Sequence, residues 1–509
     1  MKRRAFLQSA LASAVALSLP RSNLLAAAMR AEPVAPASLG AVTGDGKAVT
    51  LSERALAALR ARLRGRLLLA SDEGYEEARQ ILNPSFDKYP ALVVQPTGVA
   101  DIRAAVEFAQ EQGGLLLAVK CGGHSFSGQS TCDRGMQIDL SRFRHVRVDP
   151  ASRTAWVAGG SLLGEVDHES VAYGLATPLG TVSHTGVGGL VTGGGFGRLA
   201  RRFGLAVDNL KSVQVVSADG RLRRASADEN PDLFWGVRGG GGNFGIVTNF
   251  EFQLHPLQPQ VYGGSMVFPM ARARDAIELF AAYGPEAPDD LSLGFTMAQP
   301  PGDQPGVVVF EVCYSGAESG AERALAPLRK LGKPLADEIR PVDYVELQRS
   351  SDMEDPRALG IYLKGGFIRS LTPALTAAII DGFRPDPRRM TALFFQVGGG
   401  AIARVPPDAT AFAQRDIFAN MLTISGWRFG DDPTEHIQAT RAYWSELEPH
   451  TNGFYVNDLV PDATVAAIQA NYRQNHERLV AVKNQYDPTN LFRLNANVKP
   501  STVTASLQG

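Results

Sequence analysis

The sequence predicts an α+β protein whose two parts are built differently. Between Ala91 and Pro256, short apolar strands alternate with helical stretches, and three glycine clusters interrupt this pattern. After Pro256, longer strand-like runs follow one another with helices between them, which is typical of an antiparallel sheet with helices on one side. Hydrophobic residues make up 44% and charged residues 20% of the 509 residues, so the chain has an ordinary globular composition.

The charge balance and the apolar runs exclude some classes of protein. The formal net charge is −1, which argues against a nucleic-acid-binding protein. Beyond the N-terminal region no run of 18 or more apolar residues occurs, so we expect no stable membrane insertion. Three cysteines allow at most one disulfide bond, and no metal site is predicted.

The first 28 residues have the three-part layout of an export signal. Basic residues at positions 2–4 precede an apolar run at 9–19 and small residues at 26–28. Arg3-Arg4 followed by Phe6-Leu7 resembles a twin-arginine signal, a route that carries folded proteins, often with their cofactor. The alternative is a general secretory signal. In both cases we expect a periplasmic or secreted protein and leave residues 1–28 out of the fold.

The first part of the mature chain covers residues 32–256. Its predicted elements are a helix after Ser52, strands at Ala91–Gln95 and Leu115–Val119 around a helix at Val99–Gln112, short strands at Met136–Leu140, Val146–Val148 and Ala155–Ala158, and a helix at Ser161–Tyr173. Val213–Ser217 and Arg221–Arg224 are predicted to form a hairpin, because Asp219-Gly220 between them is a strong turn signal.

The second part covers residues 257–450, and a third segment covers 451–509. The strands predicted in the second part are Gly263–Phe268, Leu291–Thr296, Val307–Tyr314, Ala392–Val397 and Met421–Trp427, with helices at Ala271–Tyr283 and Ala321–Leu331. In the third segment we expect a helix near Val465–Lys483 followed by an ordered tail.

The glycine clusters carry the functional signal. They lie at residues 120–128, 186–197 and 239–247, and the first follows directly on a predicted strand. Backbone without side chains lets peptide N–H groups converge on an anion such as phosphate. A single cluster is as well explained by a tight turn, but three in one mixed region predict a large ligand against the backbone. A dinucleotide fits that requirement.

Two common nucleotide motifs do not account for these clusters. The chain lacks G-x-x-x-x-G-K-[ST], which excludes a P-loop. A nicotinamide site of the Rossmann type needs its glycines between the first strand and helix, whereas those at 186–197 follow a helix and a loop.

The strings in and around the clusters resemble a known family. Residues 122–129, Gly-Gly-His-Ser-Phe-Ser-Gly-Gln, followed by Ile-Asp-Leu-Ser at 138–141, are similar to the FAD domain of the p-cresol methylhydroxylase/vanillyl-alcohol oxidase superfamily. The closer match is its berberine-bridge-enzyme-like branch. Residues 177–189, 232–247 and 486–495 continue the resemblance in the same order, so that it covers nearly all of the mature chain.

The resemblance implies a two-lobed PCMH-type FAD-binding domain, formed by residues 32–256 and completed by 451–509. A substrate-binding domain at 257–450 would cap the isoalloxazine ring. The cofactor-binding residues that it implies are Cys121, Gly122, Gly123, His124, Ser125, Gly128, Gln129, Val182, Thr185, Gly186, Gly188, Gly189, Gly193, Gly197, Gly245, Ile246, Val247, Tyr455, Asn457 and Asn495.

His124 is the implied covalent anchor of the flavin. Taken alone, a histidine in a glycine loop is more often bonded to its own turn. The resemblance implies instead that a ring nitrogen carries the flavin 8α-methyl carbon, and imidazole is a competent nucleophile for that bond. Many members of the branch have a second anchor, a cysteine, where this chain has Val182. We therefore expect one covalent bond, and we expect Cys121 and Cys132 to pack behind the loop.

The implied chemistry is hydride removal from a C–H bond activated by an alcohol, amine or phenol, with a base taking the accompanying proton. Tyr455 is the candidate base, although a role in holding the flavin is an alternative. Gln396 is a candidate substrate contact, and Lys364 and Arg404 are weaker ones. Many members have a second tyrosine at Asp458, which leaves the contacts there open.

Thr185 is the residue from which we predict the electron acceptor. By resemblance it lies beside the face of the flavin through which oxygen enters, and its small side chain predicts an oxidase that forms hydrogen peroxide. Two alternatives remain: a dehydrogenase or oxidative cyclase of secondary metabolism that uses another acceptor, and a flavin-binding protein without catalysis. The small organic substrate is either a carbohydrate alcohol or an aromatic, alkaloid-like compound.

Overall fold

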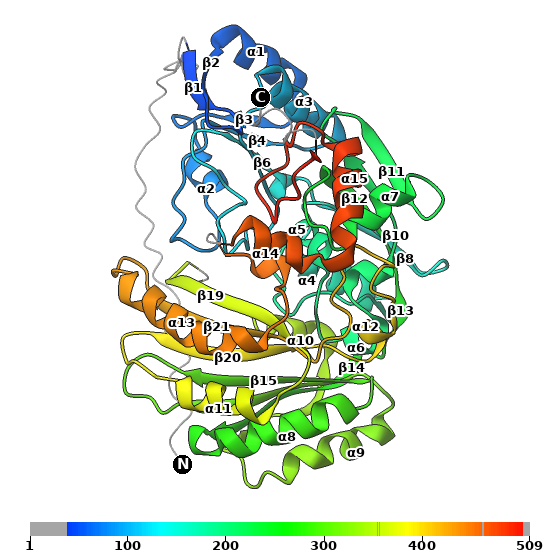
Figure 1. Ribbon diagram of the computed structural model, residues 1–509. Helices are drawn as coiled ribbons and strands as arrows, with labels where there is room; N and C mark the ends of the chain where they lie inside the picture. The colour runs from blue at the N-terminus through cyan, green and yellow to red at the C-terminus, as the bar shows by residue number, and fades with distance from the viewer. Residues whose placement is uncertain (1–37, 354, 356, 461–462, 502–509) are drawn as a thin grey trace, which may run out of the picture. The chain divides into compact units, whose positions relative to one another are not determined.

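A computed structural model describes residues 38–353, 355, 357–460 and 463–501. Two lobes are seen in Figure 1. The first lobe contains residues 38–256 and the returning segment 451–501, and the second lobe is a large antiparallel sheet with its helices. The predicted α+β class is confirmed. The export signal predicted at residues 1–28 lies outside the described residues.

Two sheets organise the first lobe. A four-stranded sheet has the order β3-β4-β6-β5, in which β4, β6 and β5 are parallel and β3 is antiparallel to β4. A five-stranded antiparallel sheet has the order β11-β10-β12-β8-β7. Their strands are β3 (Arg66–Leu68), β4 (Leu92–Gln95), β5 (Leu117–Lys120), β6 (Met136–Asp139), β7 (Val146–Asp149), β8 (Thr154–Ala158), β10 (Leu210–Val216), β11 (Leu222–Ser226) and β12 (Ile246–Gln253).

Helices and two small ribbons complete this lobe. The elements are β1 (Ser38–Val42), β2 (Ala48–Ser52), α1 (Glu53–Arg62), α2 (Tyr75–Arg79), α3 (Val99–Glu111), α4 (Leu163–Val171), β9 (Leu175–Ala176), α5 (Val187–Gly193), α6 (Ala200–Phe203), α7 (Pro231–Val237) and β13 (His255–Pro256). The helix predicted after Ser52 is α1, and the Ser52 side chain caps it by accepting a hydrogen bond from the Ala55 N–H.

The second lobe is an eight-stranded antiparallel sheet of order β17-β14-β16-β15-β20-β21-β19, with β18 paired to β14. The strands are β14 (Gln260–Pro269), β15 (Leu291–Gln299), β16 (Val307–Tyr314), β17 (Ala336–Asp337), β18 (Arg340–Asp343), β19 (Leu359–Ile368), β20 (Met390–Val397) and β21 (Ala419–Arg428). The helices are α8 (Ala273–Glu286), α9 (Glu318–Arg329), α10 (Tyr344–Arg349), α11 (Pro373–Gly382), α12 (Ala401–Arg404) and α13 (Thr434–Leu447).

The two faces of this sheet have different neighbours. Phe295, Phe395 and Met421 share an apolar core with Phe280 of α8, and α8, α9 and α11 lie below the sheet in Figure 1. Because side chains alternate along a strand, Gln396, next to Phe395, lies on the opposite face. That face is turned toward the first lobe.

The sequence reasoning missed β19, the edge strand. It pairs with β21 along ten residues, yet Gly360, Gly365 and Gly366 interrupt the apolar pattern that identifies a strand. The first lobe covers part of this edge, since the Asn83 side chain donates a hydrogen bond of 2.8 Å to the Ile361 carbonyl.

The helix predicted near Val465–Lys483 is two helices, α14 (Val465–Asn471) and α15 (His476–Tyr486). Arg473 between them has a φ of +50°, a left-handed conformation that an α-helix does not accommodate. The break lets α15 lie against α7 in the first lobe.

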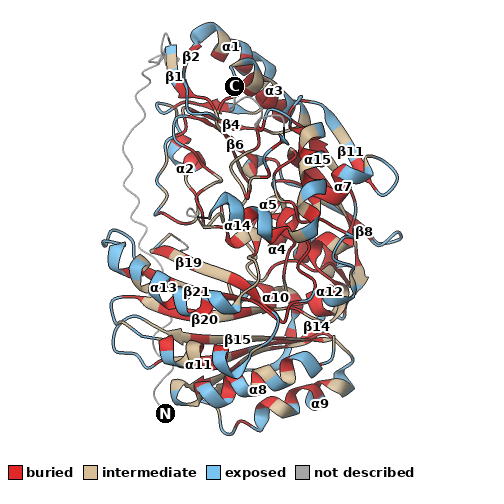
Figure 2. Ribbon diagram, in the orientation of Figure 1, coloured by how far each residue is buried: buried red, intermediate tan, exposed pale blue. Residues whose placement is uncertain are grey.

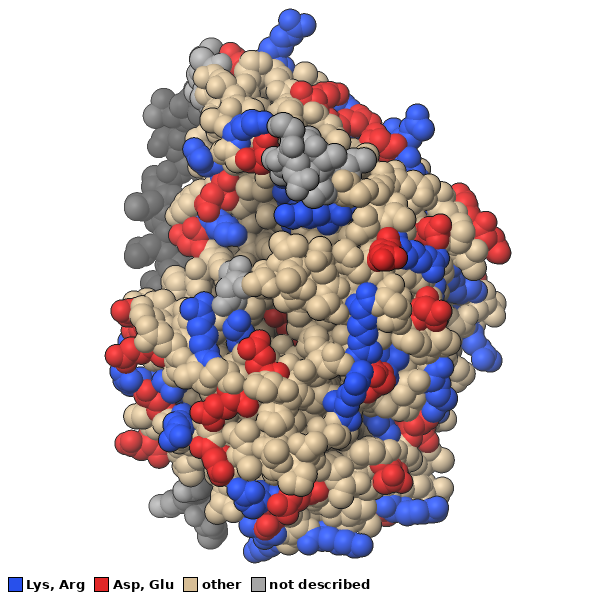
Figure 3. Space-filling view, in the orientation of Figure 1, with Lys and Arg blue, Asp and Glu red and all other residues tan. Residues whose placement is uncertain are grey.

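Buried and exposed residues are distributed according to their place in the two lobes. Figure 2 shows buried strands and central helices, with exposed outer faces on α1, α8, α9 and α13. Figure 3 shows acidic and basic side chains interspersed over the visible face. All three cysteines are free thiols. Within the described part of the chain, no helix has the length and apolar character needed to cross a membrane.

Candidate active site

The first glycine cluster starts at the end of β5, where Lys120 fixes the chain. The Lys120 ammonium group is buried, lies 3.5 Å from the Asp139 carboxylate and donates to the carbonyls of Ala78 and Gln80. Desolvation lowers its pKa, and Asp139 opposes that shift. The strand end is therefore anchored before the loop begins.

The first and second clusters meet backbone to backbone at Gly122 and Gly186. A Cβ atom on Gly122 would lie 2.3 Å from the Gly186 nitrogen, and one on Gly186 would lie 2.4 Å from the Cys121 sulfur. Neither position has room for a side chain. Burial raises the pKa of the Cys121 thiol to about 11, so this sulfur packs as a neutral thiol behind the loop.

His124 and His184 form a pair where these clusters meet. The Nε2 atom of His124 lies 2.7 Å from the Nδ1 atom of His184, and the Thr185 hydroxyl lies 3.4 Å from the other nitrogen of His124. Burial, reinforced by His184, lowers the pKa of His124 to about 4. At neutral pH His124 is therefore an uncharged imidazole.

His184 was not among the residues predicted for the site. It stands two positions before Gly186, inside residues 177–189, which resemble the family. A histidine in a matched string has no feature that marks it as a partner of another histidine 60 residues away. Only the fold brings the two rings together.

The second cluster is a short helix, α5, with Gly186 as its N-cap. At its end, a Cβ atom on Gly193 would lie 2.2 Å from the Asn457 side-chain oxygen, so a larger residue there would displace the Asn457 side chain. Asn457 also donates to the Leu190 carbonyl at 2.9 Å. A Cβ atom on Gly188 would lie 2.7 Å from the Gly159 carbonyl oxygen, and one on Gly197 would lie 1.6 Å from that of Leu179.

Other glycines of the clusters face open space. No atom lies within 4 Å of a Cβ built on Gly189 or Gly241, and only the Asn495 amide, at 3.9 Å, approaches one on Gly242. Several buried polar atoms nearby in the sequence have no hydrogen-bond partner among the described residues. They are Ser130 Oγ, Thr131 Oγ1, His184 Nε2, Asn495 Oδ1 and Asn497 Oδ1. Open backbone beside unsatisfied polar groups fits a dinucleotide lying along these segments.

The remaining predicted positions of the first loop shape its turn. Gly123 and Gly128 have φ values of +71° and +68°, a region that favours glycine. The Ser125 hydroxyl accepts a hydrogen bond from the Gln129 N–H at 3.1 Å. Val182, whose carbonyl accepts from Thr185, has an apolar side chain with no nucleophilic atom.

The third cluster is fastened to the C-terminal segment. Gly245, with a φ of +149°, leads into β12, which begins with Ile246 and Val247. The Asn243 amide donates to the Ala496 carbonyl at 3.0 Å and accepts from the Val498 N–H at 2.9 Å. This clamp sets Asn495 beside Gly242.

Lys483 connects the same parts from the interior. Its ammonium group is fully buried, lies 2.7 Å from the Asp487 carboxylate and donates to the carbonyls of Asn243 and Phe492. Asp487 also accepts from the N–H groups of Leu491 and Phe492. Residues 486–495 therefore form a structural lock on the third cluster.

Tyr455 comes from the segment that returns from the second lobe. Its hydroxyl accepts hydrogen bonds from the Gly195 N–H at 2.8 Å and the Asn457 amide at 2.7 Å. The ring packs edge-on against Phe196, with 5.2 Å between centroids. Burial raises the pKa of the Tyr455 hydroxyl well above its ordinary value. The tyrosine thus ties the returning segment to the second cluster.

Asp458, three residues on, belongs to a polar chain that crosses between the lobes. The Asn420 amide on β21 donates to the Asp458 carboxylate at 2.6 Å and to the Gln396 side-chain oxygen at 3.0 Å. Burial raises the pKa of the Asp458 carboxyl to about 7. Asn420 was not predicted from the sequence, because it sits within an apolar strand without a motif.

Gln396 lines a cavity of about 110 Å³ between the lobes. The first lobe contributes Thr181 and residues 196–198, and the sheet contributes residues of β15, β16 and β20. Most aromatic residues of this lobe are core. Phe268, Phe295, Phe367, Phe395 and Trp427 are buried, whereas Phe394 is half-buried; Phe394 lines the cavity together with Phe295 and Phe395.

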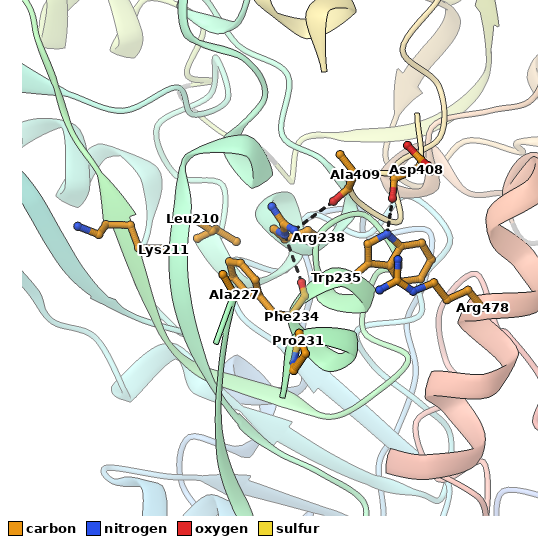
Figure 4. Close-up of a pocket in the computed structure, with 10 residues that line it drawn as sticks. All are labelled: Leu210, Lys211, Ala227, Pro231, Phe234, Trp235, Arg238, Asp408, Ala409 and Arg478. Carbon is orange, nitrogen blue, oxygen red and sulfur yellow. Dashed lines mark hydrogen bonds between the residues drawn. The ribbon is translucent and has the colours of Figure 1, made fainter. Parts of the chain in front are cut away.

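A larger surface groove of about 640 Å³ lies elsewhere, along α7 (Figure 4). Trp235 donates to the Asp408 carbonyl and stacks under the Arg478 guanidinium at 4.2 Å, and Arg238 stacks on Phe234 at 4.3 Å. None of its lining residues belongs to the three glycine clusters. Arg404 is also away from the site, in a surface ion pair with Asp289 at 2.7 Å.

Comparisons with known proteins define the class of this molecule. A family model described as an FAD binding domain matches residues 90–226, and one described as berberine and berberine-like matches residues 455–499. The chain is therefore an FAD-linked oxidoreductase. It belongs to the berberine-bridge-enzyme-like family of PCMH-type flavoproteins.

Three relatives illustrate the range of that family. An FAD-linked oxidoreductase of Dictyostelium discoideum is 33% identical over 84% of this chain and 94% of its own length. The (R)-6-hydroxynicotine oxidase of Paenarthrobacter nicotinovorans is 28% identical over 86% of this chain and 97% of its own. A solved xylooligosaccharide oxidase of Myceliophthora thermophila, bound to xylobiose, has a TM-score of 0.78 at 26% identity, covering 88% of this chain and 99% of that one.

Proposed function

We propose that this chain is an exported oxidase that binds FAD covalently through His124 alone, removes a hydride from an activated C–H bond and forms hydrogen peroxide. The observation that carries the proposal is the His124–His184 pair at the contact of two glycine clusters. Bound FAD supplies the hydride acceptor and the electrophilic 8α-methyl carbon.

The chain's own residues support the covalent bond. An imidazole nitrogen must be unprotonated to form it, and the lowered pKa of His124 keeps the ring neutral above pH of about 4. His184 orients the ring and offers a nitrogen within hydrogen-bond distance for the proton that His124 releases. Val182 offers no second nucleophile, so His124 is the single anchor.

The test uses acid-precipitated protein. The wild-type pellet should stay yellow and its polypeptide should fluoresce as flavin on a denaturing gel. His124→Ala should release all flavin into the supernatant. His168→Ala, an exposed histidine on α4, should retain it. Flavin retained by His124→Ala would mean that another residue is the anchor, and a colourless wild-type protein that takes up no FAD would end the proposal.

Tyr455 and Gln396 have different roles in this proposal. Both hydrogen bonds to the Tyr455 hydroxyl come from groups that hold the second cluster, which supports a positioning role rather than that of the base. Gln396 lines the cavity between the lobes, which supports contact with the substrate. The small organic substrates of the relatives, a hydroxynicotine and a xylooligosaccharide, bracket the range to be screened.

Rapid mixing distinguishes the two electron acceptors. The reduced enzyme should react with oxygen and release hydrogen peroxide, because Thr185 is small and its hydroxyl is turned toward His124. A reduced enzyme that is inert to oxygen but reacts rapidly with a quinone would be a dehydrogenase. A cyclised product would instead identify an oxidative cyclase.

A further inference from the structure

The direction of the hydrogen bonds made by Asn420 determines which end of the Gln396 amide, the oxygen or the NH₂ group, faces the cavity. Once ionised, the Asp458 carboxylate only accepts hydrogen bonds, so the group that meets it at 2.6 Å is the Asn420 NH₂. The second N–H of the same NH₂ group meets Gln396 at 3.0 Å, and the Gln396 atom at that contact is therefore its oxygen. What remains for the cavity is the NH₂ group of Gln396.

Because Asn420 and Asp458 are buried, reversing the direction of these hydrogen bonds would cost free energy. Asn420 is fully buried, and Asp458 is 8% exposed. If the Asn420 amide were turned over, its oxygen would face the ionised Asp458 carboxylate in a buried site, and two acceptors would meet without a proton between them. Gln396 lines the cavity, and its nitrogen bonds to no atom of the described residues.

We propose that Asp458, acting through Asn420, holds Gln396 as a hydrogen-bond donor toward the substrate, so that the reacting group enters as an acceptor oxygen rather than as an ammonium. The inference rests on the proposed function and narrows its substrate class to alcohols and related oxygen-bearing groups. Asp458 and Asn420 are positioning residues, and Gln396 is the residue that contacts substrate.

The experiment measures ligand preference on the oxidised holoenzyme through changes in flavin absorption. Two aromatic probes that are not oxidised are titrated at pH 8.5: acetophenone, whose oxygen only accepts, and benzamidinium, which only donates. The wild type should bind acetophenone about ten-fold or more tightly than benzamidinium, the difference expected for one matched against one mismatched hydrogen bond. A preference below about three-fold, including no binding of either probe, overturns the inference.

Two substitutions test the direction of the hydrogen bonds that link Asp458, Asn420 and Gln396. In Gln396→Glu, Asn420 still donates to one carboxylate oxygen while the other faces the cavity as an acceptor, so the preference should reverse. In Asp458→Asn, no charge fixes the Asn420 amide, and the preference should shrink to about three-fold or less while the unfolding midpoint shows a folded protein. An unchanged preference in both variants overturns the inference.

A matched control and an independent assay complete the design. Gln299→Glu places the same charge at the far end of the neighbouring strand β15, where Gln299 donates to loop carbonyls, and it should keep the wild-type preference. Flavin content and peroxide production from a screened substrate are measured in parallel. Their loss in the wild type refutes the proposed function, whereas a normal flavoprotein without the preference refutes only this inference.

Discussion

At the scale of single residues, His184 gives a direct test of the proposed cofactor attachment. It contacts His124 at 2.7 Å, and its other nitrogen is buried without a partner among the described residues. We expect His184→Ala to slow covalent incorporation of FAD about ten-fold or more, because it removes a proton acceptor and an orienting hydrogen bond. In-gel flavin fluorescence against time after adding FAD to apoprotein measures this. An unaltered rate would show that His184 only fills space.

The Asp458 carboxyl predicts that the free energy of unfolding depends on pH. Its folded pKa of about 7 lies above the ordinary value of 3.8, so the folded state binds the proton more tightly. Its contribution to the free energy of unfolding is therefore fully present below pH of about 4 and is lost as the pH rises through 7. Relative to Asp458→Asn, the wild type should lose stability between pH 5 and pH 8, by on the order of 1–3 kcal/mol.

Urea unfolding of both proteins at the two pH values measures that difference. Changes in all other titrating groups are common to both proteins and cancel in the comparison. A difference that stays constant between pH 5 and pH 8 would show that Asp458 is ionised throughout this range in the folded protein.

At the scale of elements, the lock between α15 and the third glycine cluster has a measurable energy. Lys483→Met leaves the Asp487 carboxylate buried without its ion-pair partner. Loss of one partner of a buried ion pair costs about 3–5 kcal/mol. We expect a fall of that size in the free energy of unfolding. Lys499→Met, at an exposed lysine in the same segment, should change it by less than about 0.5 kcal/mol.

Elements could be predicted from the sequence where one local signal was enough. Val307–Tyr314 was predicted with the boundaries it has, because a mostly apolar, β-branched run of that length, broken only by Glu311, has few alternatives. The strand β19 was missed because glycines weaken its pattern, and the Val465–Lys483 helix was predicted as continuous because Arg473 has no breaking signal in the sequence.

The residues of the candidate site also differ in whether the sequence alone could predict them. His124 could be proposed as the anchor because its loop carries a specific string after a strand. His184, Asn420 and Asp458 act through partners that are distant in the sequence, and periodicity or spacing does not report such contacts. Glycine clusters predicted close backbone approach, but which glycines contact protein and which face open space depends on how the segments pack.

At the scale of the whole molecule, substitutions at different glycines distinguish effects on folding from effects on cofactor binding. Gly186 lies against the first cluster, where an added Cβ would be 2.3 Å from the Gly122 nitrogen. Gly186→Ala should therefore force the two clusters apart, lowering both the stability of the apoprotein and its FAD content. Gly40→Ala, in a strand of the first lobe with no atom within 4 Å of the new Cβ, is the matched control and should retain FAD.

Gly189→Ala should instead change stability and cofactor binding in opposite directions. Gly189 lies inside α5 with no atom within 4 Å of an added Cβ, so alanine is accommodated in the apoprotein. Alanine favours a helix over glycine by about 0.5–1 kcal/mol, and the apoprotein should gain stability of that order. If FAD lies along this backbone, the new methyl group occupies its space, and FAD content should fall about ten-fold or more. Thermal unfolding of apoprotein and flavin absorbance of the loaded protein measure the two effects. A Gly189→Ala protein with full FAD content would place the cofactor away from α5 and would require a different path for the dinucleotide between the three glycine clusters.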